Sequence, residues 1–150
     1  MTNLERVQRL ISSGKYSDGV LMITDGISRR FCSGFSSSAG IMLITASKSA
    51  YLTDFRYIEA ATAAMPGVEV KMVSRGQKYS DYINEFLADV SADKVYYENT
   101  RTSVAEHKAF SEAINATLLP LDNALMYLRA EKQTFELENM KKAQKITDAA

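Results

Sequence analysis

One stretch decides the fold of this chain: GIMLITASKSAYLTDFRYIEAA, residues 40–61. Residues 40–45 form a short apolar run, which is typical of a strand buried on both faces of a sheet. A four-residue polar connection, residues 46–49, leads to a second run at 51–53, so we expect an antiparallel hairpin. After Asp54 the apolar residues follow a helical period: Ile58, Ala61, Thr62 and Met65. The stretch therefore predicts a strand that passes directly into a helix.

Strand and helix patterns alternate along the rest of the chain. Further apolar runs typical of strands lie at residues 19–24, 68–73, 94–97 and 118–120. Further helical spacing is found at residues 4–11, at 79–90, after the capping box Ser103-Val-Ala-Glu106, and at 125–128. We interpret Asp25-Gly26 as a plain turn. The alternation predicts an α/β domain in which helices are layered on a mixed sheet.

Composition and charge limit the classes of function. The chain has 150 residues, 46% of them hydrophobic and 24% charged, which suits one compact domain with a sizeable core. Lysine plus arginine equals aspartate plus glutamate, 18 of each, so no net charge favours nucleic acid or an anionic membrane. The N-terminus is too polar for a signal peptide, and the single cysteine, Cys32, cannot form an internal disulfide. We therefore expect a cytoplasmic location.

The C-terminal part differs in character from the rest. Residues 129–134 are charged and polar, as in a linker. Apolar residues then keep helical spacing to the end of the chain: Met140, Ala143, Ile146 and Ala150. An amphipathic helix of this length needs an apolar partner to be stable. We therefore divide the chain into a domain at 1–128 and a linker with a first helix at 129–150, and expect that helix to lead into a further domain.

Histidine and cysteine, the residues most used in catalysis, are sparse. Catalytic metal sites and nucleophilic triads nearly always use histidine, and the chain has one, His107. It lies on a helical stripe with Val104, Phe110 and Ile114, where a packed structural role is favoured over a ligand or base. Cys32 has no sequence neighbour that would lower its pKa, so a small buried residue is the favoured interpretation. We assign no catalytic or metal-binding residue to the chain.

Carboxylates at the ends of apolar runs offer an alternative. Four residues stand in such positions: Asp25, Asp54, Glu98 and Asp122. If the sheet gathered three of them, they could hold two divalent ions for phosphodiester cleavage, as in ribonuclease-H-like nucleases. Against this, three of the four stand at turn or helix-cap positions, and no basic stripe is present to hold nucleic acid. The two-metal nuclease is therefore the less favoured hypothesis.

The tetrapeptide Asp54-Phe-Arg-Tyr57 is the most unusual in the chain. Asp54 can cap the following helix, whereas Arg56 in the first turn has the wrong sign for the helix dipole and would prefer another acceptor. A carboxylate-binding role and a surface arginine lying over the sheet edge account for Arg56 equally well. Residues 34–40, rich in glycine and serine, are interpreted as a turn first and as a ligand loop second.

Two motifs together resemble a known family. They are CSGFSSSAGIMLIT, residues 32–45, and YLTDFRYIEAA, residues 51–61. In this order and at this separation they resemble the N-terminal domain of the creatinase/prolidase family, which includes Xaa-Pro aminopeptidases and Xaa-Pro dipeptidases. Residues 128–137 and 140–150 are similar to the stretch that joins that domain to the catalytic pita-bread domain. The resemblance spans nearly the whole chain.

The resemblance implies a fold, a metal requirement and a set of partners. The implied fold is a ribonuclease-H-like α/β layer without its metal carboxylates. Family members hydrolyse the peptide bond before proline with two divalent ions, usually manganese, held in the pita-bread domain, so no cofactor is expected in this chain. The implied partners are its own C-terminal catalytic domain, further copies in a homo-oligomer and, for the full-length parent, proline-containing peptides. Nucleic acid and membranes are not expected partners.

For this chain the resemblance implies a non-catalytic N-terminal domain of a proline-specific metallopeptidase. Such a domain contributes to oligomer contacts and to the wall that limits substrate access. The residues singled out for that wall or for an interface are Phe35, Asp54, Arg56 and Tyr57. The family often has serine or glycine in place of Phe55, and a second glycine in place of Ser37. The alternative is a stand-alone binding or oligomerisation module of the same fold.

Overall fold

Helices and strands alternate along the chain in the computed structural model, which describes residues 1–150. The strands are β1 (Val20–Ile23), β2 (Ile41–Ile44), β3 (Ser49–Thr53), β4 (Glu69–Met72), β5 (Lys94–Tyr97) and β6 (Thr117–Pro120). The helices are α1 (Asn3–Ser12), α2 (Gly26–Ser33), α3 (Ile58–Ala64), α4 (Tyr79–Asp89), α5 (Val104–Ala113), α6 (Ala124–Ala130) and α7 (Thr134–Asp148). The predicted α/β class is confirmed.

One mixed sheet holds all six strands, in the order β4-β3-β2-β1-β5-β6. β2 pairs antiparallel with β1 and with β3, and the other three pairings are parallel. The predicted hairpin is therefore confirmed, with Leu43 opposite Ala50. Parallel neighbours need long crossover connections, and here those connections contain helices.

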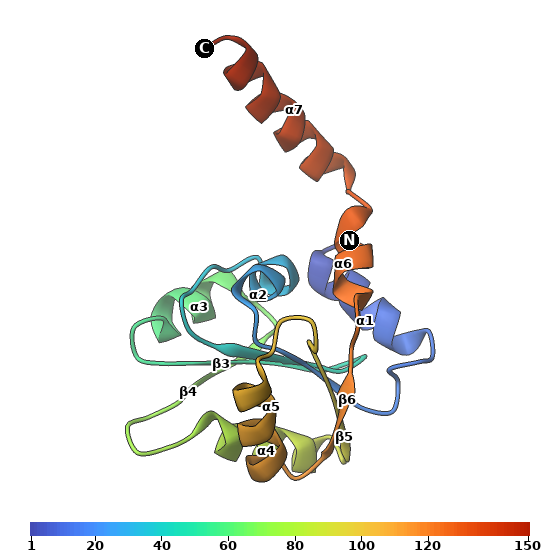
Figure 1. The fold of residues 1–150 in the computed structure, drawn as a ribbon. Coiled ribbons are helices and arrows are strands. Elements are labelled where there is room, and N and C mark those ends of the chain that lie inside the picture. The colour runs from blue at the N-terminus through green and yellow to red at the C-terminus, as the bar shows by residue number, and fades with distance from the viewer.

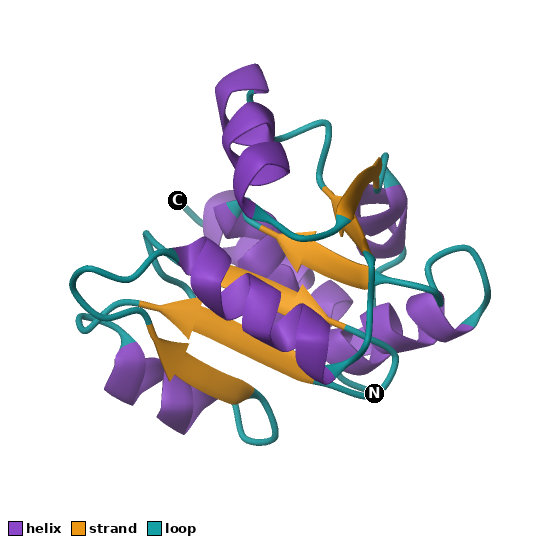
Figure 2. Cartoon of the chain, turned by 90° about the horizontal axis from the view of Figure 1, so that it is seen from below, coloured by secondary structure: helices purple, strands orange, loops and turns teal.

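Helices cover both faces of the sheet (Figures 1 and 2). α1, α2, α3 and α6 lie on one face, and α4 and α5 lie on the other. Because successive strand residues point to opposite faces, β1 directs Leu21 and Ile23 to the first layer and Val20 and Met22 to the second. All four side chains are fully buried. Burying a side chain of this size contributes about 1.5–3 kcal/mol to stability.

The helix α2 corrects one interpretation of the sequence. Asp25-Gly26 is not a plain turn, because the Asp25 carboxylate accepts the backbone N–H groups of Ile27 and Ser28 at 3.1 and 3.0 Å and so begins the helix. The helix ends at Gly34, which adopts the left-handed conformation with φ 72°. Asp-Gly is a strong turn signal, so the eight-residue helix that follows it was missed.

The helix α7 extends away from the layered body (Figure 1). None of its residues is buried. Four of its apolar side chains are 44% to 74% exposed: Phe135, Leu137, Met140 and Ile146. The end of α6 is held in place, since the buried Arg6 donates to the carbonyl oxygens of Leu128 and Glu131 at 2.7 and 2.8 Å. The chain therefore leaves the body from a fixed point.

Candidate functional site

The four residues singled out from the sequence lie together where β3 runs into α3. β3 ends at Thr53 and α3 begins at Ile58, so residues 54–57 form the junction. The fourth residue, Phe35, lies in the loop after α2, and its ring contacts Tyr57 in the junction. We refer to Phe35, Asp54, Arg56 and Tyr57 as the aromatic–arginine cluster.

Asp54 and Arg56 form an ion pair within the junction. Asp54 Oδ1 accepts hydrogen bonds from the backbone N–H and Nε of Arg56, both at 3.0 Å, and Oδ2 accepts one from Nη2 at 2.7 Å. These bonds hold the pKa of Asp54 below its usual value and raise the pKa of Arg56. The acceptor that Arg56 requires is therefore Asp54. The expectation that Asp54 caps the helix was wrong, because Tyr57 occupies the N-cap position and no side chain caps it.

Two aromatic rings complete the aromatic–arginine cluster. The Arg56 guanidinium lies 5.2 Å from the centre of the Tyr57 ring, which is a cation–π distance. The Phe35 ring stands edge-on to Tyr57, with centroids 6.4 Å apart, and to Tyr51 at 6.0 Å. The Tyr57 hydroxyl lies 2.7 Å from Ser38 Oγ and accepts the Ser38 N–H at 3.3 Å, which lowers the pKa of Tyr57. The structure thus brings all four predicted residues into contact.

The serine-rich loop, residues 34–40, supports the aromatic–arginine cluster. Ser37 Oγ lies 2.6 Å from the hydroxyl of the buried Tyr51. The buried Arg29 donates to the carbonyl oxygens of Ser37 and Gly40 at 2.9 and 2.7 Å. Gly40 has φ 146°, and a Cβ there would lie 3.0 Å from Tyr51 Oη and from a carbonyl oxygen of β3, so a larger residue would be strained. These contacts make the loop a support for neighbouring side chains.

Arg29 and Tyr51 also support the site, and neither was predicted from the sequence. Tyr51 was correctly assigned to a strand. Nothing in the sequence shows that its hydroxyl forms a hydrogen bond with the hydroxyl of Ser37. Arg29 stands three residues before the buried Cys32, so both fall on the inner face of α2. The signal was therefore the helical spacing of these two residues, and it was lost when residues 25–26 were taken as a turn.

The four carboxylates of the nuclease hypothesis do not form a metal site. No group of three or more His, Cys, Asp or Glu side chains is placed to hold an ion. Asp25 caps α2, Asp54 pairs with Arg56, and Asp122 lies 3.6 Å from the ammonium of Lys15. Glu98 Oε2 accepts the backbone N–H groups of residues 24 and 25, both at 3.1 Å, and burial raises the pKa of this carboxyl. The donors present therefore do not fit a pair of divalent ions.

The single histidine and the single cysteine both lie against other side chains. The His107 ring on α5 is centred 4.9 Å from the ring of Tyr97 at the end of β5. Cys32 is buried in the first layer, where loss of solvent raises the pKa of its thiol. A thiol with a raised pKa has little thiolate at neutral pH and is a poor nucleophile. Neither residue is part of the aromatic–arginine cluster.

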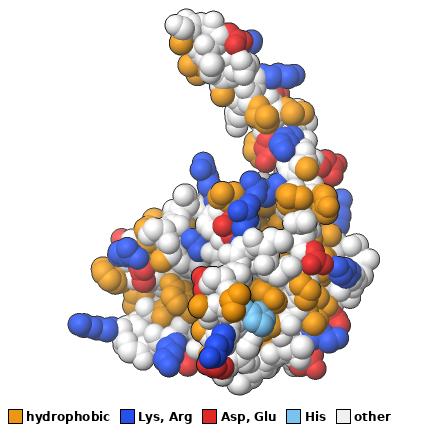
Figure 3. All heavy atoms as spheres, in the orientation of Figure 1, with side chains coloured by type: hydrophobic (Ala, Val, Ile, Leu, Met, Phe, Trp, Pro, Cys, Tyr) orange, Lys and Arg blue, Asp and Glu red, His pale blue; other side chains and the backbone are white.

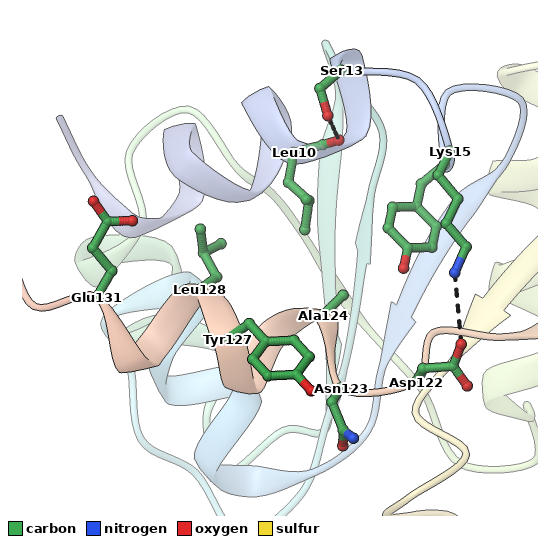
Figure 4. A pocket seen from close by; sticks show the side chains of 10 residues that line it. Leu10, Ser13, Lys15, Asp122, Asn123, Ala124, Tyr127, Leu128 and Glu131 are labelled. Atoms are coloured by element: carbon green, nitrogen blue, oxygen red, sulfur yellow. Dashed lines mark hydrogen bonds and ion pairs between the residues drawn. The ribbon is translucent and has the colours of Figure 1, made fainter.

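A groove of about 630 Å³ lies between α1 and α6 (Figure 4). Its apolar lining consists of Leu10, Tyr16, Ala124, Tyr127 and Leu128. The Lys15–Asp122 ion pair stands at one end and Glu131 at the other (Figure 4). The lining contains no histidine or cysteine. This composition suits a contact surface for another apolar group.

Exposed apolar side chains continue from this groove toward α7. The space-filling view shows hydrophobic atoms along the projecting helix and at its base (Figure 3). The large apolar side chains that are exposed on α6 and α7 include Met126, Tyr127, Phe135 and Met140. Contiguous exposed apolar surface commonly marks a site of contact with another protein surface. No helix of the chain, α7 included, combines the length and apolar character needed to cross a lipid bilayer.

Comparison with known proteins gives a consistent family match. The family model described as Creatinase/Prolidase N-terminal domain matches residues 4–130. The uncharacterized peptidase YqhT of Bacillus subtilis (strain 168) is 27% identical over 148 residues, which are 98% of this chain and 41% of that protein. The chain therefore spans about two fifths of the length of this relative.

Solved structures share the fold. The Xaa-Pro dipeptidase from Bacillus anthracis matches with a TM-score of 0.88 and 27% identity, over 99% of this chain and 41% of that chain. The N-terminal domain of the cytoplasmic peptidase PepQ from Mycobacterium tuberculosis H37Rv matches with a TM-score of 0.70 and 24% identity, over 84% of this chain and 97% of that chain. At that identity the second match shows the fold alone.

Proposed function

We infer the function from one premise: the chain belongs to the creatinase/prolidase N-terminal domain family. We propose that it is the non-catalytic N-terminal domain of a proline-specific metallopeptidase, an Xaa-Pro aminopeptidase or dipeptidase. The observation that carries this proposal is the match over residues 4–130 to a family whose relatives continue well beyond this chain. In such a protein, hydrolysis and the divalent ions, with manganese the ion we expect, belong to the catalytic domain.

The chain divides, in this proposal, into the N-terminal domain at 1–128 and a connecting segment at 129–150. The connecting segment includes α7, which has no buried residue and leaves large apolar side chains exposed. Covering them with the catalytic domain would remove exposed apolar area from water at about 25 cal/mol per Å². We further propose that the protein forms a homo-oligomer, partly through contacts at the groove between α1 and α6. Its proposed location is the cytoplasm.

The aromatic–arginine cluster forms, in this proposal, part of the wall that limits substrate access. Its residues lie at one end of the sheet, and Phe55 beside it is 78% exposed. An exposed phenylalanine offers an apolar contact for a peptide, next to the half-exposed Arg56 that Asp54 neutralises. The departure from the family pattern at Phe55 therefore bears on which peptides enter.

A hydrolysis assay tests the assignment. The 150-residue chain, with manganese added, should leave Xaa-Pro dipeptides and longer Xaa-Pro peptides intact. The longer protein encoded by the same reading frame should cleave them and lose activity with a chelator. Turnover that follows the 150-residue chain through purification would overturn the non-catalytic role. Activity of the longer protein that a chelator leaves unchanged would overturn the metallopeptidase assignment, and a stop codon directly after Ala150 would favour a stand-alone module.

Peptide-length preference tests the access wall. Arg56→Ala in the longer protein should change the ratio of kcat/KM for tripeptides and dipeptides while changing the unfolding midpoint little, because the Arg56 side chain is 53% exposed and an ion pair open to solvent on one side contributes little. Arg9→Ala, at an exposed arginine on α1, is the matched control. Equal ratios for Arg56→Ala and Arg9→Ala would show that Arg56 does not shape the wall.

A further inference from the structure

Arg29 is a buried cation without an anionic partner. Its side chain is 5% exposed, and none of the ion pairs of the chain includes it. Nη1 donates to the carbonyl oxygens of Thr24 and Gly40 at 2.6 and 2.7 Å, and Nη2 donates to that of Ser37 at 2.9 Å, while Nε has no partner. Burying a charge without a counter-ion is unfavourable unless good hydrogen bonds offset it. Backbone carbonyls provide the whole of that compensation here.

These carbonyls belong to two separate parts of the chain. Thr24 follows β1, whereas Ser37 and Gly40 lie in the serine-rich loop that leads into β2. A guanidinium is planar and presents its donors in a fixed fork, so it sets the relative positions of the groups that it bonds. Arg29 therefore fastens the serine-rich loop to the end of β1.

The fastened loop in turn carries the aromatic–arginine cluster. Ser37 Oγ donates its single proton to the carbonyl oxygen of Ala39 at 2.8 Å, so Tyr51 is the donor in the hydroxyl pair at 2.6 Å. The next residue, Ser38, holds the Tyr57 hydroxyl by its side chain and its backbone N–H. The Arg56 guanidinium lies over the Tyr57 ring. An unbroken series of contacts thus runs from Arg29 to Arg56.

We propose that Arg29 is a positioning residue, which acts through residues 37–40 to set the place of Tyr57 and Arg56 in the aromatic–arginine cluster. The consequence for substrate access rests on the proposed function, but the positioning itself does not. A residue that only stabilised the fold would change the unfolding midpoint and leave the surroundings of Tyr57 in the folded chain unaltered. The pKa of the Tyr57 hydroxyl therefore distinguishes a positioning role of Arg29 from a role in fold stability alone.

Titration of Tyr57 in the 150-residue chain tests the proposal. The ¹³Cζ signal of Tyr57, assigned by its loss in Tyr57→Phe, should titrate below the usual tyrosine value of about 10 in the wild type. Arg29→Lys keeps the charge but not the fork, and should raise the pKa of Tyr57. Ser38→Ala should raise it too, and adding Arg29→Lys to Ser38→Ala should raise it by less than Arg29→Lys does alone, because only the Ser38 N–H bond is then left to lose. Arg30→Lys, at the exposed neighbour on the same helix, should leave it unchanged.

Two results would overturn the proposal. One is a folded Arg29→Lys chain in which Tyr57 titrates as in the wild type. The other needs no substitution: resolved ¹⁵Nη signals with slow rotation about Nε–Cζ are expected for the Arg29 guanidinium, and free rotation would show that the carbonyl bonds do not hold. Arg29→Lys is also made in the longer protein. If the pKa of Tyr57 rises as expected but the peptide-length preference of the longer protein does not change, the proposed role in substrate access is refuted, whereas the positioning role of Arg29 is supported.

Discussion

Replacing Tyr51 by phenylalanine isolates one buried hydrogen bond. The Tyr51 ring is fully buried, and its hydroxyl lies 2.6 Å from Ser37 Oγ. Phenylalanine keeps the ring and its edge contact with Phe35, so the variant loses the bond without opening a large cavity. A hydrogen bond of this kind contributes a net of about 0.5–1.5 kcal/mol. We therefore expect Tyr51→Phe to lower the free energy of unfolding by about 1 kcal/mol.

Urea unfolding followed by circular dichroism measures this loss, and thermal unfolding should give a midpoint about 2–4 °C lower. A double-mutant cycle with Ser37→Ala isolates the pair, because each single variant already removes the shared bond. The double variant should therefore be more stable than the sum of the two losses predicts. Tyr127→Phe is the matched control, since the Tyr127 side chain is 68% exposed, and it should leave stability nearly unchanged.

The cycle also gives the result that would refute this reasoning. If the losses of Tyr51→Phe and Ser37→Ala add to within about 0.3 kcal/mol, the two hydroxyls do not stabilise each other. The serine-rich loop would then be held by its backbone contacts alone.

Three further changes probe the core, the buried acid and the buried thiol. Leu43→Ala should lower the free energy of unfolding by about 2–5 kcal/mol in urea, because the side chain is fully buried, and a loss below about 1 kcal/mol would contradict the packing described. Burial raises the pKa of Glu98 in the folded chain above 4.5, its ordinary value in the unfolded chain. The folded chain therefore holds this proton more tightly, and its stability should fall as the pH rises from 4.5 to the raised pKa. The Glu98→Gln variant should not show this loss of stability. If the stability–pH curves of the wild type and of Glu98→Gln run parallel, the raised pKa of Glu98 is disproved. Cys32 should react with a thiol reagent only after urea unfolding, and fast labelling of the folded chain would show that it is accessible.

Most of the sheet could be predicted from the sequence because its strands are nearly pure apolar runs. β1 and β2 are buried at every position, so neither strand shows polar alternation and both read as interior strands. The short connection between β2 and β3 then fixed the antiparallel hairpin. The tail helix was also predictable, because apolar residues at helical spacing continue through α7.

The candidate site was predictable only in part. Arg56 stood out because the sequence pattern placed it in a first helical turn, where an arginine opposes the helix dipole, whereas α3 begins only at Ile58 and Arg56 precedes its N-cap. The partner of Arg56 was not predictable, since Asp54 turns its carboxylate to Arg56 only where the backbone of 54–57 brings the two groups together. Arg29 was not predictable at all without α2, because its three acceptors are backbone carbonyls, which every residue carries.

Because Arg6 binds the carbonyl oxygens at the end of α6, the position from which α7 extends is fixed. Only residues 131–133 separate α6 from α7, and three extended residues span at most about 11 Å. A helix of 15 residues adds about 22 Å. Any surface that covers α7 must therefore lie within this reach of the end of α6, so the short connection and the length of the helix limit where such a contact can form.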